Sequence, residues 1–348
     1  MKSVCFKDIG KVECIDLPDP QIVDPSDVII KTSLAGLCGS DLHPFFGRET
    51  GLDIDTVMGH EVVGEIVAAG KEVSDFKVGD HVYAPFSTNC GNCYYCQNHL
   101  PSRCVAGQLF GWLQNGTGLN GCQSEFVRVP LADGTLMKKP DSLSDVAALL
   151  LGDNFSTGFY CAEMADVKPS GTYAVVGCGT VGLLCIVAAK SMGAEQIFAL
   201  DPVVTRRQQA ESLGAIAFDS SDAAVAEILQ RTHGRGVDGV MELVGIPAAQ
   251  ELAYKLIRPG GIMSVIGCHC TPNFAFSPVD AYDKNLTYKT GRCPARYYMS
   301  KLTDRVANGE FNIDSFVTHH YAADDCVEAY DVFSNRKDSC LKAVFDFR

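Results

Sequence analysis

The chain has 348 residues, of which 47% are hydrophobic and 20% are charged. At about 150 residues per domain, this length predicts two domains, and the composition excludes a disordered tail or a fibrous protein. The 29 basic residues are outnumbered by 42 acidic residues, which gives a formal net charge of −13. A chain this acidic, without a basic run, is not expected to bind nucleic acid or an anionic membrane surface.

The first residues are charged and polar, without the apolar stretch of a secretory signal. An uncharged stretch over residues 172–189 has the length of a membrane span, but it contains three glycines at the spacing of a phosphate-binding loop. We therefore interpret it as a strand, a turn and a helix. Sixteen cysteines, several at metal-ligand spacing, favour thiol chemistry in a reducing compartment. The expected location is the cytoplasm.

The first part of the chain predicts short strands separated by Gly, Pro and Asp turns, at 28–33, 62–69, 81–84 and 125–129. From about residue 171, strands are predicted at 172–176, 197–200, 215–218, 237–243 and 262–266. Helices are predicted between them at 181–192, 206–213, 223–231 and 248–257. This alternation predicts a parallel, doubly wound sheet.

The tail from about residue 292 returns to the first pattern, with one helix near 299–308 followed by short strands. The sequence therefore predicts an α/β protein with two domains. A β domain comprises residues 1–156 and 292–348, and an inserted α/β domain comprises residues 157–291.

A glycine motif, Gly177-x-Gly179-x-x-Gly182, follows a predicted strand and opens a predicted helix. These glycines allow a tight turn and let the backbone approach a pyrophosphate at the helix N-terminus, where Thr180 and Val181 also lie. The alternative is a glycine-rich packing turn.

Asp201 ends the next predicted strand, 19 residues after the last glycine of the motif. A carboxylate at this place accepts hydrogen bonds from an adenine ribose and repels a 2′-phosphate, so NAD is favoured over NADP. Arg206 lies five residues further on and weakens that preference. The alternative for Asp201 is a solvated aspartate.

Four cysteines lie within the segment 88–106 at spacings of x2, x2 and x7, namely Cys90, Cys93, Cys96 and Cys104. Four thiolates suit a tetrahedral Zn²⁺ and leave no position open for a substrate, so this zinc would be structural. The segment has few aliphatic residues and depends on the ion to fold. A disulfide pair and an iron–sulfur cluster are the alternatives, which the compartment and the spacing respectively disfavour.

A second group of candidate ligands is spread along the chain. Cys38, His60 and Asp153 supply one sulfur, one nitrogen and one oxygen, and a catalytic zinc takes three protein ligands with one position open. Glu61, next to a ligand, is a candidate transient fourth ligand. Ser40, two residues after Cys38, is a further polar candidate beside these ligands. Taken singly, each of these residues is equally consistent with ordinary packing.

Together these motifs resemble the zinc-dependent medium-chain alcohol dehydrogenases. The resemblance covers nearly the whole chain and includes the Cys-x-Ser-Asp-x-His run, the Gly-His-Glu, the four-cysteine segment, VPLADGTLMKKPDSL, GCGTVG, GRCPA and VTHH. It implies a GroES-like β-barrel catalytic domain and a Rossmann cofactor domain. It also implies a zinc- and NAD-dependent oxidoreductase acting on an alcohol or polyol, with one catalytic and one structural zinc per chain.

The resemblance also implies roles for single residues. It implies a proton relay from Ser40 through the cofactor ribose to His43, whose ordinary pKa of about 6.5 suits proton release. Asp41 resembles the carboxylate that orients the histidine ligand, here His60, and a simple turn residue is the alternative.

One departure from the family concerns the third ligand, which is a cysteine in many members and Asp153 here. The run Asp-x-x-x-Thr-Gly-Phe resembles both the secondary-alcohol branch and the formaldehyde-handling branch. The first branch typically prefers NADP and often lacks the cysteine segment, so the chain matches neither branch in every respect. Alternatives to an alcohol dehydrogenase are an aldehyde or formaldehyde dehydrogenase or dismutase on the same scaffold, and a non-catalytic NAD-binding or structural protein.

The substrate pocket and the oligomer are the least specified. Trp112, the only tryptophan, and Cys293 are candidate pocket residues by resemblance, with an ordinary core position as the alternative for each. The expected partners are a small alcohol or carbonyl substrate and further copies of the chain. A homodimer or homotetramer is expected, with its contact near residues 275–290.

Overall fold

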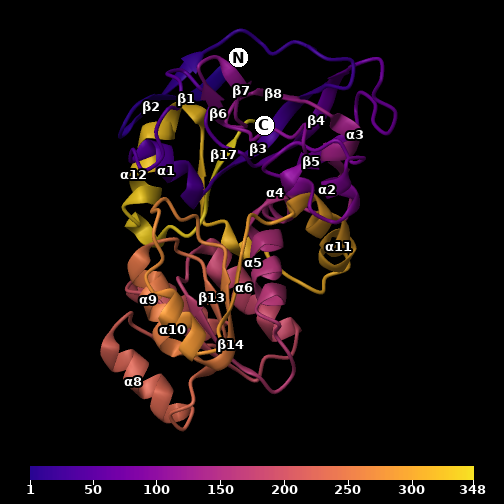
Figure 1. Ribbon diagram of the computed structural model, residues 1–348. Helices are drawn as coiled ribbons and strands as arrows, with labels where there is room; N and C mark the ends of the chain where they lie inside the picture. The colour runs from indigo at the N-terminus through magenta and orange to yellow at the C-terminus, as the bar shows by residue number, and fades with distance from the viewer. The chain divides into compact units, whose positions relative to one another are not determined.

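The computed structural model describes residues 1–348 (Figure 1). The chain divides into two compact units, one made of Met1–Ser156 with Pro294–Arg348 and one made of Thr157–Cys293. The chain leaves the first unit once and returns to it. No helix is long and apolar enough to cross a membrane.

The first unit is built around one long strand, β3, which has ten residues and is buried over most of its length. It pairs with β4, β8 and β17 within a seven-stranded sheet of order β16-β17-β3-β4-β5-β9. Two hairpins, β1-β2 and β6-β7, stand outside this sheet. The strands of this unit are β1 Lys2–Asp8, β2 Lys11–Asp16, β3 Val28–Leu37, β4 Val62–Ala69, β5 His81–Ala84, β6 Trp112–Gln114, β7 Thr117–Leu119, β8 Phe126–Val129, β9 Met137–Lys138, β16 His319–Tyr321 and β17 Ala343–Asp346.

Two apolar clusters form the core of this unit. Ile30, Ile66 and Val82 belong to a cluster between strands β3, β4 and β5. Leu37 and Tyr330 belong to another, where α12 packs beside the β1-β2 hairpin. The helices here are α1 Leu42–Phe45, α2 Tyr94–Gln97, α3 Ala132–Thr135, α4 Asp145–Gly152, α11 Ala295–Ala307 and α12 Cys326–Ser334.

The expectation of strands alone in the first 150 residues is wrong at α4. Its run of Ala, Leu and Gly is buried on every side from Ala147 to Gly152, so it shows no polar–apolar period that would mark a helix. Ser144 caps it by accepting a hydrogen bond from the Ala147 amide. A further helix, α5 Asn154–Met164, begins after one intervening residue, Asp153.

The second unit is a six-stranded sheet of order β12-β11-β10-β13-β14-β15, and all its strand pairs are parallel. This is the doubly wound order of a dinucleotide-binding domain. Its core gathers Val176, Leu200, Val240 and Val265 from four strands. The elements are β10 Thr172–Val176, α6 Thr180–Ser191, β11 Gln196–Leu200, α7 Val204–Ser212, β12 Ile216–Phe218, α8 Asp222–Arg231, β13 Val237–Glu242, α9 Pro247–Leu256, β14 Ile257–Val265, α10 Pro278–Asp283 and β15 Thr287–Thr290.

The α/β alternation predicted from the sequence is confirmed, with one difference at β14. This strand begins at Ile257, whereas the sequence predicts helix to that residue and strand only from 262. Ile257 pairs with Val237 before a register shift, and pairing resumes at Ile262 with Gly239. The Pro-Gly-Gly turn expected after the helix is accommodated as an irregularity inside the strand.

Candidate active site

The carboxylate of Asp41, just after β3, holds two candidate ligand residues in place. A short turn, Gly39–Asp41, follows Cys38. Asp41 Oδ2 accepts a hydrogen bond from the Cys38 amide at 2.8 Å, and Asp41 Oδ1 lies 3.0 Å from His60 Nδ1. This carboxylate is 6% exposed. Because it occupies Nδ1 of the imidazole, the ring presents Nε2 as its ligand atom.

Four candidate ligand residues from three distant segments meet in the first unit. Cys38 follows β3, His60 and Glu61 precede β4, and Asp153 lies between α4 and α5. Their ligand atoms all lie within 4.8 Å of one another. Asp153 Oδ2 is 3.5 Å from Cys38 Sγ and 3.4 Å from His60 Nε2. The sequence therefore named residues that the fold does bring together.

These separations fit a zinc ion. A tetrahedral ion with bonds of ~2.3 Å to sulfur and ~2.1 Å to nitrogen and oxygen has edges of about 3.6 Å from sulfur to oxygen and about 3.4 Å from nitrogen to oxygen. The separations from Asp153 Oδ2 are 3.5 and 3.4 Å. Burial raises the pKa of this carboxyl, but His60, together with Lys342 and Glu61, outweighs burial and lowers the pKa to about 2. Asp153 is therefore a carboxylate at neutral pH, which is the form that a metal ligand requires.

Glu61 is held by a lysine that the sequence analysis missed. Lys342 Nζ lies 2.6 Å from both Oε1 and Oε2 of Glu61, and the two side chains are 1% and 0% exposed. The Glu61 charge outweighs burial and raises the pKa of Lys342, so the lysine is a cation. Gly36 on β3 makes room for this pair, because a Cβ there would lie 1.7 Å from Glu61 Oε2.

Asn154 is the other missed residue. Its Nδ2 donates to Glu61 Oε1 and to Asp153 Oδ2, both at 3.0 Å. The sequence carried a signal for the lysine, which stands between buried apolar residues just before β17. A glycine within β3 was a further signal, since a glycine inside a strand often marks a close approach. Nothing in the sequence distinguished Asn154.

The two candidate relay residues lie on the same short segment. Ser40 Oγ is 3.4 Å from His60 Nε2, so its hydroxyl lies beside the candidate ligand atoms. His43, on α1, is 8% exposed. Burial lowers the pKa of this imidazole below its ordinary value. His43 is therefore neutral, and able to accept a proton, at neutral pH.

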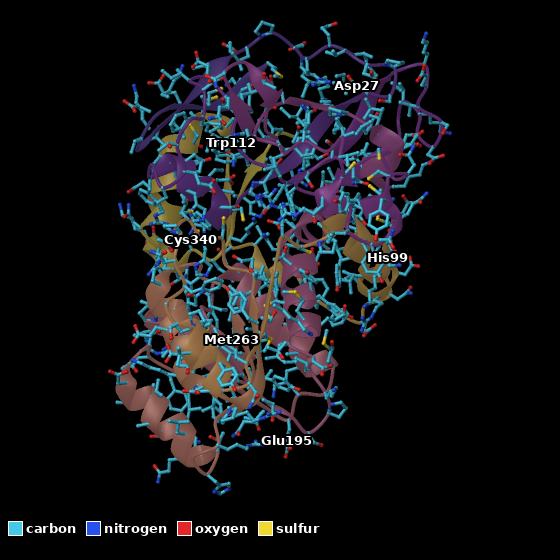
Figure 2. The ribbon with its side chains drawn as sticks, in the orientation of Figure 1. Asp27, His99, Trp112, Glu195, Met263 and Cys340 are labelled. Atoms are coloured by element: carbon cyan, nitrogen blue, oxygen red, sulfur yellow. The ribbon has the colours of Figure 1, made fainter.

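The two candidate pocket residues remain predictions. Trp112 (Figure 2) is half-buried at the start of β6 and pairs with Leu119 in the β6-β7 hairpin. The residue before it, Gly111, packs closely on Gly59, since a Cβ there would lie 2.9 Å from the Gly59 carbonyl oxygen. This contact brings the hairpin to the segment that carries His60. Cys293 is buried at the end of the second unit.

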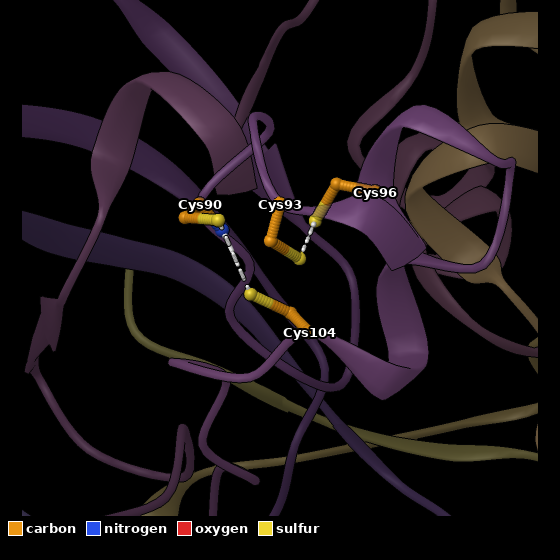
Figure 3. Close-up of side chains that lie close together, drawn as sticks. All are labelled: Cys90, Cys93, Cys96 and Cys104. Atoms are coloured by element: carbon orange, nitrogen blue, oxygen red, sulfur yellow. Dashed lines mark hydrogen bonds between the residues drawn. The ribbon is translucent and has the colours of Figure 1, made fainter.

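The four cysteines form a separate cluster (Figure 3). The Cys93 and Cys96 sulfurs are 3.5 Å apart and the Cys90 and Cys104 sulfurs are 3.4 Å apart. A tetrahedral zinc needs sulfur–sulfur separations of about 3.8 Å. Backbone amides of Cys96 and Val105 lower the pKa of Cys93 to about 6, whereas burial raises the pKa of Cys96 to about 12 and also raises that of Cys104. Without an ion, therefore, the thiolate form is favoured at Cys93 alone among these three. The donor set and its spacing fit a closed zinc site.

The glycine loop leaves space at the position where the sequence predicts a pyrophosphate. Gly182 packs helix α6 on the turn, since a Cβ there would lie 1.9 Å from the Gly177 carbonyl oxygen. Gly177 has a φ of +94°, which favours glycine. At Gly179, by contrast, the nearest atom to an added Cβ is Arg206 Nη1 at 3.9 Å. The loop is thus closely packed at Gly182 and open at Gly179, at the N-terminus of α6, as dinucleotide binding requires.

Asp201 follows β11 beside this loop. Its Oδ2 accepts a hydrogen bond from the Cys178 amide and its Oδ1 accepts one from the Val203 amide, both at 2.8 Å. Arg206 Nη1 lies 3.8 Å from Oδ2. The carboxylate is 3% exposed and fixed next to the glycine turn. Its position agrees with a ribose-binding acidic residue, with an arginine at its side.

Comparisons with known proteins identify the family of the chain. Residues 24–141 match the alcohol dehydrogenase GroES-like domain, and residues 180–308 match the zinc-binding dehydrogenase family. Zinc-type alcohol dehydrogenase B of Aspergillus flavus is 35% identical over 97% of this chain and 79% of its own length.

Two solved structures resemble the whole chain. Alcohol dehydrogenase TADH from Thermus sp. ATN1 has a TM-score of 0.92 and 32% identity, covering 99% of both chains. The 2R,3R-butanediol dehydrogenase from Bacillus subtilis has a TM-score of 0.81 and 28% identity, again covering 99% of both. The GroES-like and Rossmann architecture expected from the sequence is confirmed. The chain therefore belongs to the zinc-dependent medium-chain alcohol dehydrogenases, a family of oxidoreductases, in agreement with the expected cofactors zinc and NAD.

Proposed function

We propose that the chain transfers a hydride between a secondary alcohol or polyol and NAD, at a zinc ion held by Cys38, His60 and Asp153. The observation that carries this assignment is the meeting of Sγ, Nε2 and Oδ2 from three distant segments at the separations of a tetrahedral ion. Three ligands leave one position for a substrate oxygen. The butanediol dehydrogenase among its structural relatives supports a secondary alcohol or diol.

When bound, zinc supplies a Lewis acid for the substrate oxygen and NAD supplies the hydride acceptor. The chain's own residues bind and orient these groups and move a proton. Ser40 Oγ, beside His60 Nε2, accepts the hydroxyl proton of the alcohol and gives up its own hydroxyl proton to the cofactor ribose, which would carry the relay onward. His43 takes up the proton at the end of this relay, since burial lowers the pKa of its imidazole and keeps the ring neutral. Asp41 keeps the His60 ring and the Cys38 backbone in place.

The second unit binds NAD in this proposal. The open backbone at Gly179 and the N-terminus of α6, which includes Thr180 and Val181, receive the pyrophosphate. Asp201 binds the adenine ribose and disfavours a 2′-phosphate, and Arg206 lies at the edge of this site. The cysteine cluster holds a second, structural zinc.

The proposal is tested by zinc content and turnover in matched variants. Wild-type protein is expected to hold about two zinc ions per chain. Cys38→Ser and Asp153→Ala are expected to hold about one, and to lose about a thousandfold in NAD reduction over a panel of alcohols, since the ion is worth about 4 kcal/mol in the transition state.

Cys14→Ser is the matched control, because Cys14 is a half-buried thiol of the same unit on β2, outside both clusters. It is expected to retain both ions and full turnover. An unchanged zinc content in Cys38→Ser would contradict the assignment of the ligands. Turnover that prefers aldehydes over alcohols would move the function to the aldehyde-handling branch of the family.

We further propose a homodimer or homotetramer in the cytoplasm, formed through the β15 edge of the second unit. β15 is the last strand of its sheet, so one side of its backbone is unpaired. Three apolar side chains near it, Phe274, Val279 and Tyr282, are 60%, 66% and 82% exposed. Tyr282→Glu is expected to lower the mass measured by light scattering to that of a monomer. The reducing location is supported by the thiol clusters.

A further inference from the structure

We propose that Asn154 is a positioning residue that holds Asp153 on the metal and Glu61 away from it, and that it thereby sets the zinc affinity of the site. The inference rests on the proposed function, because it takes Asp153 as a ligand. Neither the family assignment nor the motifs of the sequence single out Asn154.

The backbone fixes this residue against the candidate ligands. Asp153 is the only residue between α4 and α5, with φ and ψ of −143° and −74°, and Asn154 is the first residue of α5. At Gly152, a Cβ would lie 2.4 Å from the Ala84 carbonyl oxygen, so the end of α4 packs directly on β5. The side chain of Asn154 is 1% exposed. It has little freedom to leave its place.

The amide of Asn154 links two carboxylates. Its two N–H groups satisfy the two contacts of 3.0 Å to Glu61 Oε1 and Asp153 Oδ2, and the Cys38 sulfur lies 3.9 Å from the same nitrogen. Two buried carboxylates this close repel each other unless a donor lies between them. Asp153 Oδ2 is also the atom nearest His60 Nε2 and Cys38 Sγ. Asn154 therefore fixes the ligand oxygen itself.

The oxygen of the Asn154 amide indicates that the side chain acts through its N–H donors. Asn154 Oδ1 is buried and has no hydrogen-bond partner. Such an orphaned buried acceptor destabilises the folded protein. Turning the amide over would place this oxygen against two carboxylate oxygens, which is worse. A side chain selected only to fill space would be apolar and would avoid the cost.

Glu61 is close enough to compete for the metal and is restrained from three sides. Lys342 binds both its oxygens, Asn154 binds Oε1, and Gly36 gives it room on the β3 side. The charges of the site would also balance with a zinc ion bound. Three anions, namely the Cys38 thiolate, Asp153 and Glu61, would then face one divalent ion and the Lys342 ammonium. A neutral amide can bridge the carboxylates without disturbing this balance, whereas another acid cannot.

The experiment measures zinc affinity at the Cys38 site by competition with a chelating dye, with the ion of the cysteine cluster as an internal reference. Asn154→Leu, of similar size, is expected to weaken the Cys38-site ion 10- to 100-fold, the usual effect of removing a group that supports a ligand. Asn154→Asp is expected to weaken it further. The cluster ion is expected to be unchanged in both variants. Cobalt substituted for zinc is expected to show a changed absorption spectrum in Asn154→Leu, since Glu61 is then able to bind.

Ser156→Ala is the matched control. Ser156 is 0% exposed, two residues further along α5, and donates to the Leu151 carbonyl at 2.6 Å rather than to the carboxylates. It is expected to lower thermal stability and to leave zinc affinity unchanged. If Asn154→Leu fails to fold, Asn154→Ser retains one donor and is expected to give an intermediate loss of affinity.

Two negative results are distinguishable. Zinc affinity in Asn154→Leu equal to that of the wild type, with the Cys38-dependent ion present in both, would overturn the role of Asn154 and leave the proposed function standing. A zinc content that does not depend on Cys38 would overturn both.

Discussion

The two clusters of candidate zinc ligands are built in different ways. The four cysteines lie within one short segment, are all half-buried, and receive hydrogen bonds mainly from nearby backbone amides. The Cys38, His60 and Asp153 site joins residues up to 115 positions apart and has a buried carboxylate, Asp153, between two half-buried ligand candidates. Side chains hold it, since Asp41 binds His60, Asn154 binds Asp153, and Lys342 binds the neighbouring Glu61.

This difference predicts different responses to loss of the metal. The cysteine segment has little apolar surface of its own, so its fold depends on the ion. The second site lies between β3, β4 and the α4–α5 junction. The apolar side chains of β3 and β4 form a core that does not depend on the metal ligands. A metal ion organises the first cluster, whereas the fold organises the second.

The largest expected effect is that of breaking the cysteine cluster. Cys93→Ser is expected to abolish its ion, worth on the order of 10 kcal/mol, and to unfold residues 90–104, with a strong loss of folded yield. The folded remainder is expected to keep the Cys38-site ion and its turnover per ion. Zinc content and limited proteolysis of this segment measure the result.

Cys14→Ser is again the control, because Cys14 is a half-buried thiol that belongs to no group of candidate metal ligands. It is expected to change neither yield nor zinc content. A well-folded but inactive Cys93→Ser protein would mean that the cluster is not structural.

Breaking the buried ion pair at the second site is expected to have the next largest effect. Lys342→Met leaves Glu61 buried without its cation and is expected to lower the free energy of unfolding by about 3–5 kcal/mol. The double variant with Glu61→Gln is expected to recover much of that loss. Urea denaturation of the single and double variants measures both terms.

The exposed pair of Lys337 and Asp331 is the matched control. Its side chains are 51% and 47% exposed. Lys337→Met is expected to cost no more than about 1 kcal/mol, because water screens exposed charges. Equal losses in Lys337→Met and Lys342→Met would show that burial of the Glu61 pair has no special weight.

The features that could be predicted directly from the sequence are those encoded within one short segment. Spacing indicated the cysteine cluster, and spacing together with the flanking predicted strand and helix indicated the glycine turn, because local motifs carry their own geometry. The candidate ligands Cys38, His60 and Asp153 share no local motif, so they were proposed from their residue types, with the family resemblance as further support. The α/β alternation was readable because strand and helix periods differ.

The unpredicted parts are those that depend on contacts between distant segments. Helix α4 is buried on all sides and shows no period. Lys342 meets Glu61 across 281 positions of sequence. Asn154 acts through a hydrogen bond to residue 61, 93 positions away. No local pattern encodes such pairs, so they become visible only in the folded structure.

The next expected effect is smaller and concerns the predicted NAD site, which was inferred from a short segment of sequence. Asp201→Gly is expected to lower the preference for NAD over NADP at least tenfold, about 1.4 kcal/mol, because it removes both the ribose acceptor and the charge that repels a 2′-phosphate. The ratio of kcat/KM values for the two cofactors measures this. Asp219→Gly, at an exposed position after β12, is the control. An unchanged ratio in Asp201→Gly would contradict the ribose assignment.

The smallest expected effect concerns the pH dependence of stability at His43. Burial is the largest influence on its pKa and lowers it, and Arg48 acts in the same direction. Glu49 and Asp41 oppose them without reversing the shift. A histidine whose folded pKa is depressed binds protons more readily when unfolded. Its contribution to stability is therefore complete above the unfolded pKa of about 6.5 and is lost as pH falls below that value.

His43→Gln is accordingly expected to reduce the loss of unfolding free energy between about pH 7 and pH 5 relative to the wild type. His233→Gln, at an exposed turn after α8, is expected to leave the slope unchanged. Urea denaturation at several pH values measures the slopes. If His43→Gln and the wild type lose stability equally on acidification, then His43 is not held neutral by the fold. Its proposed role as acceptor of the proton from Ser40 would then lose its physical basis.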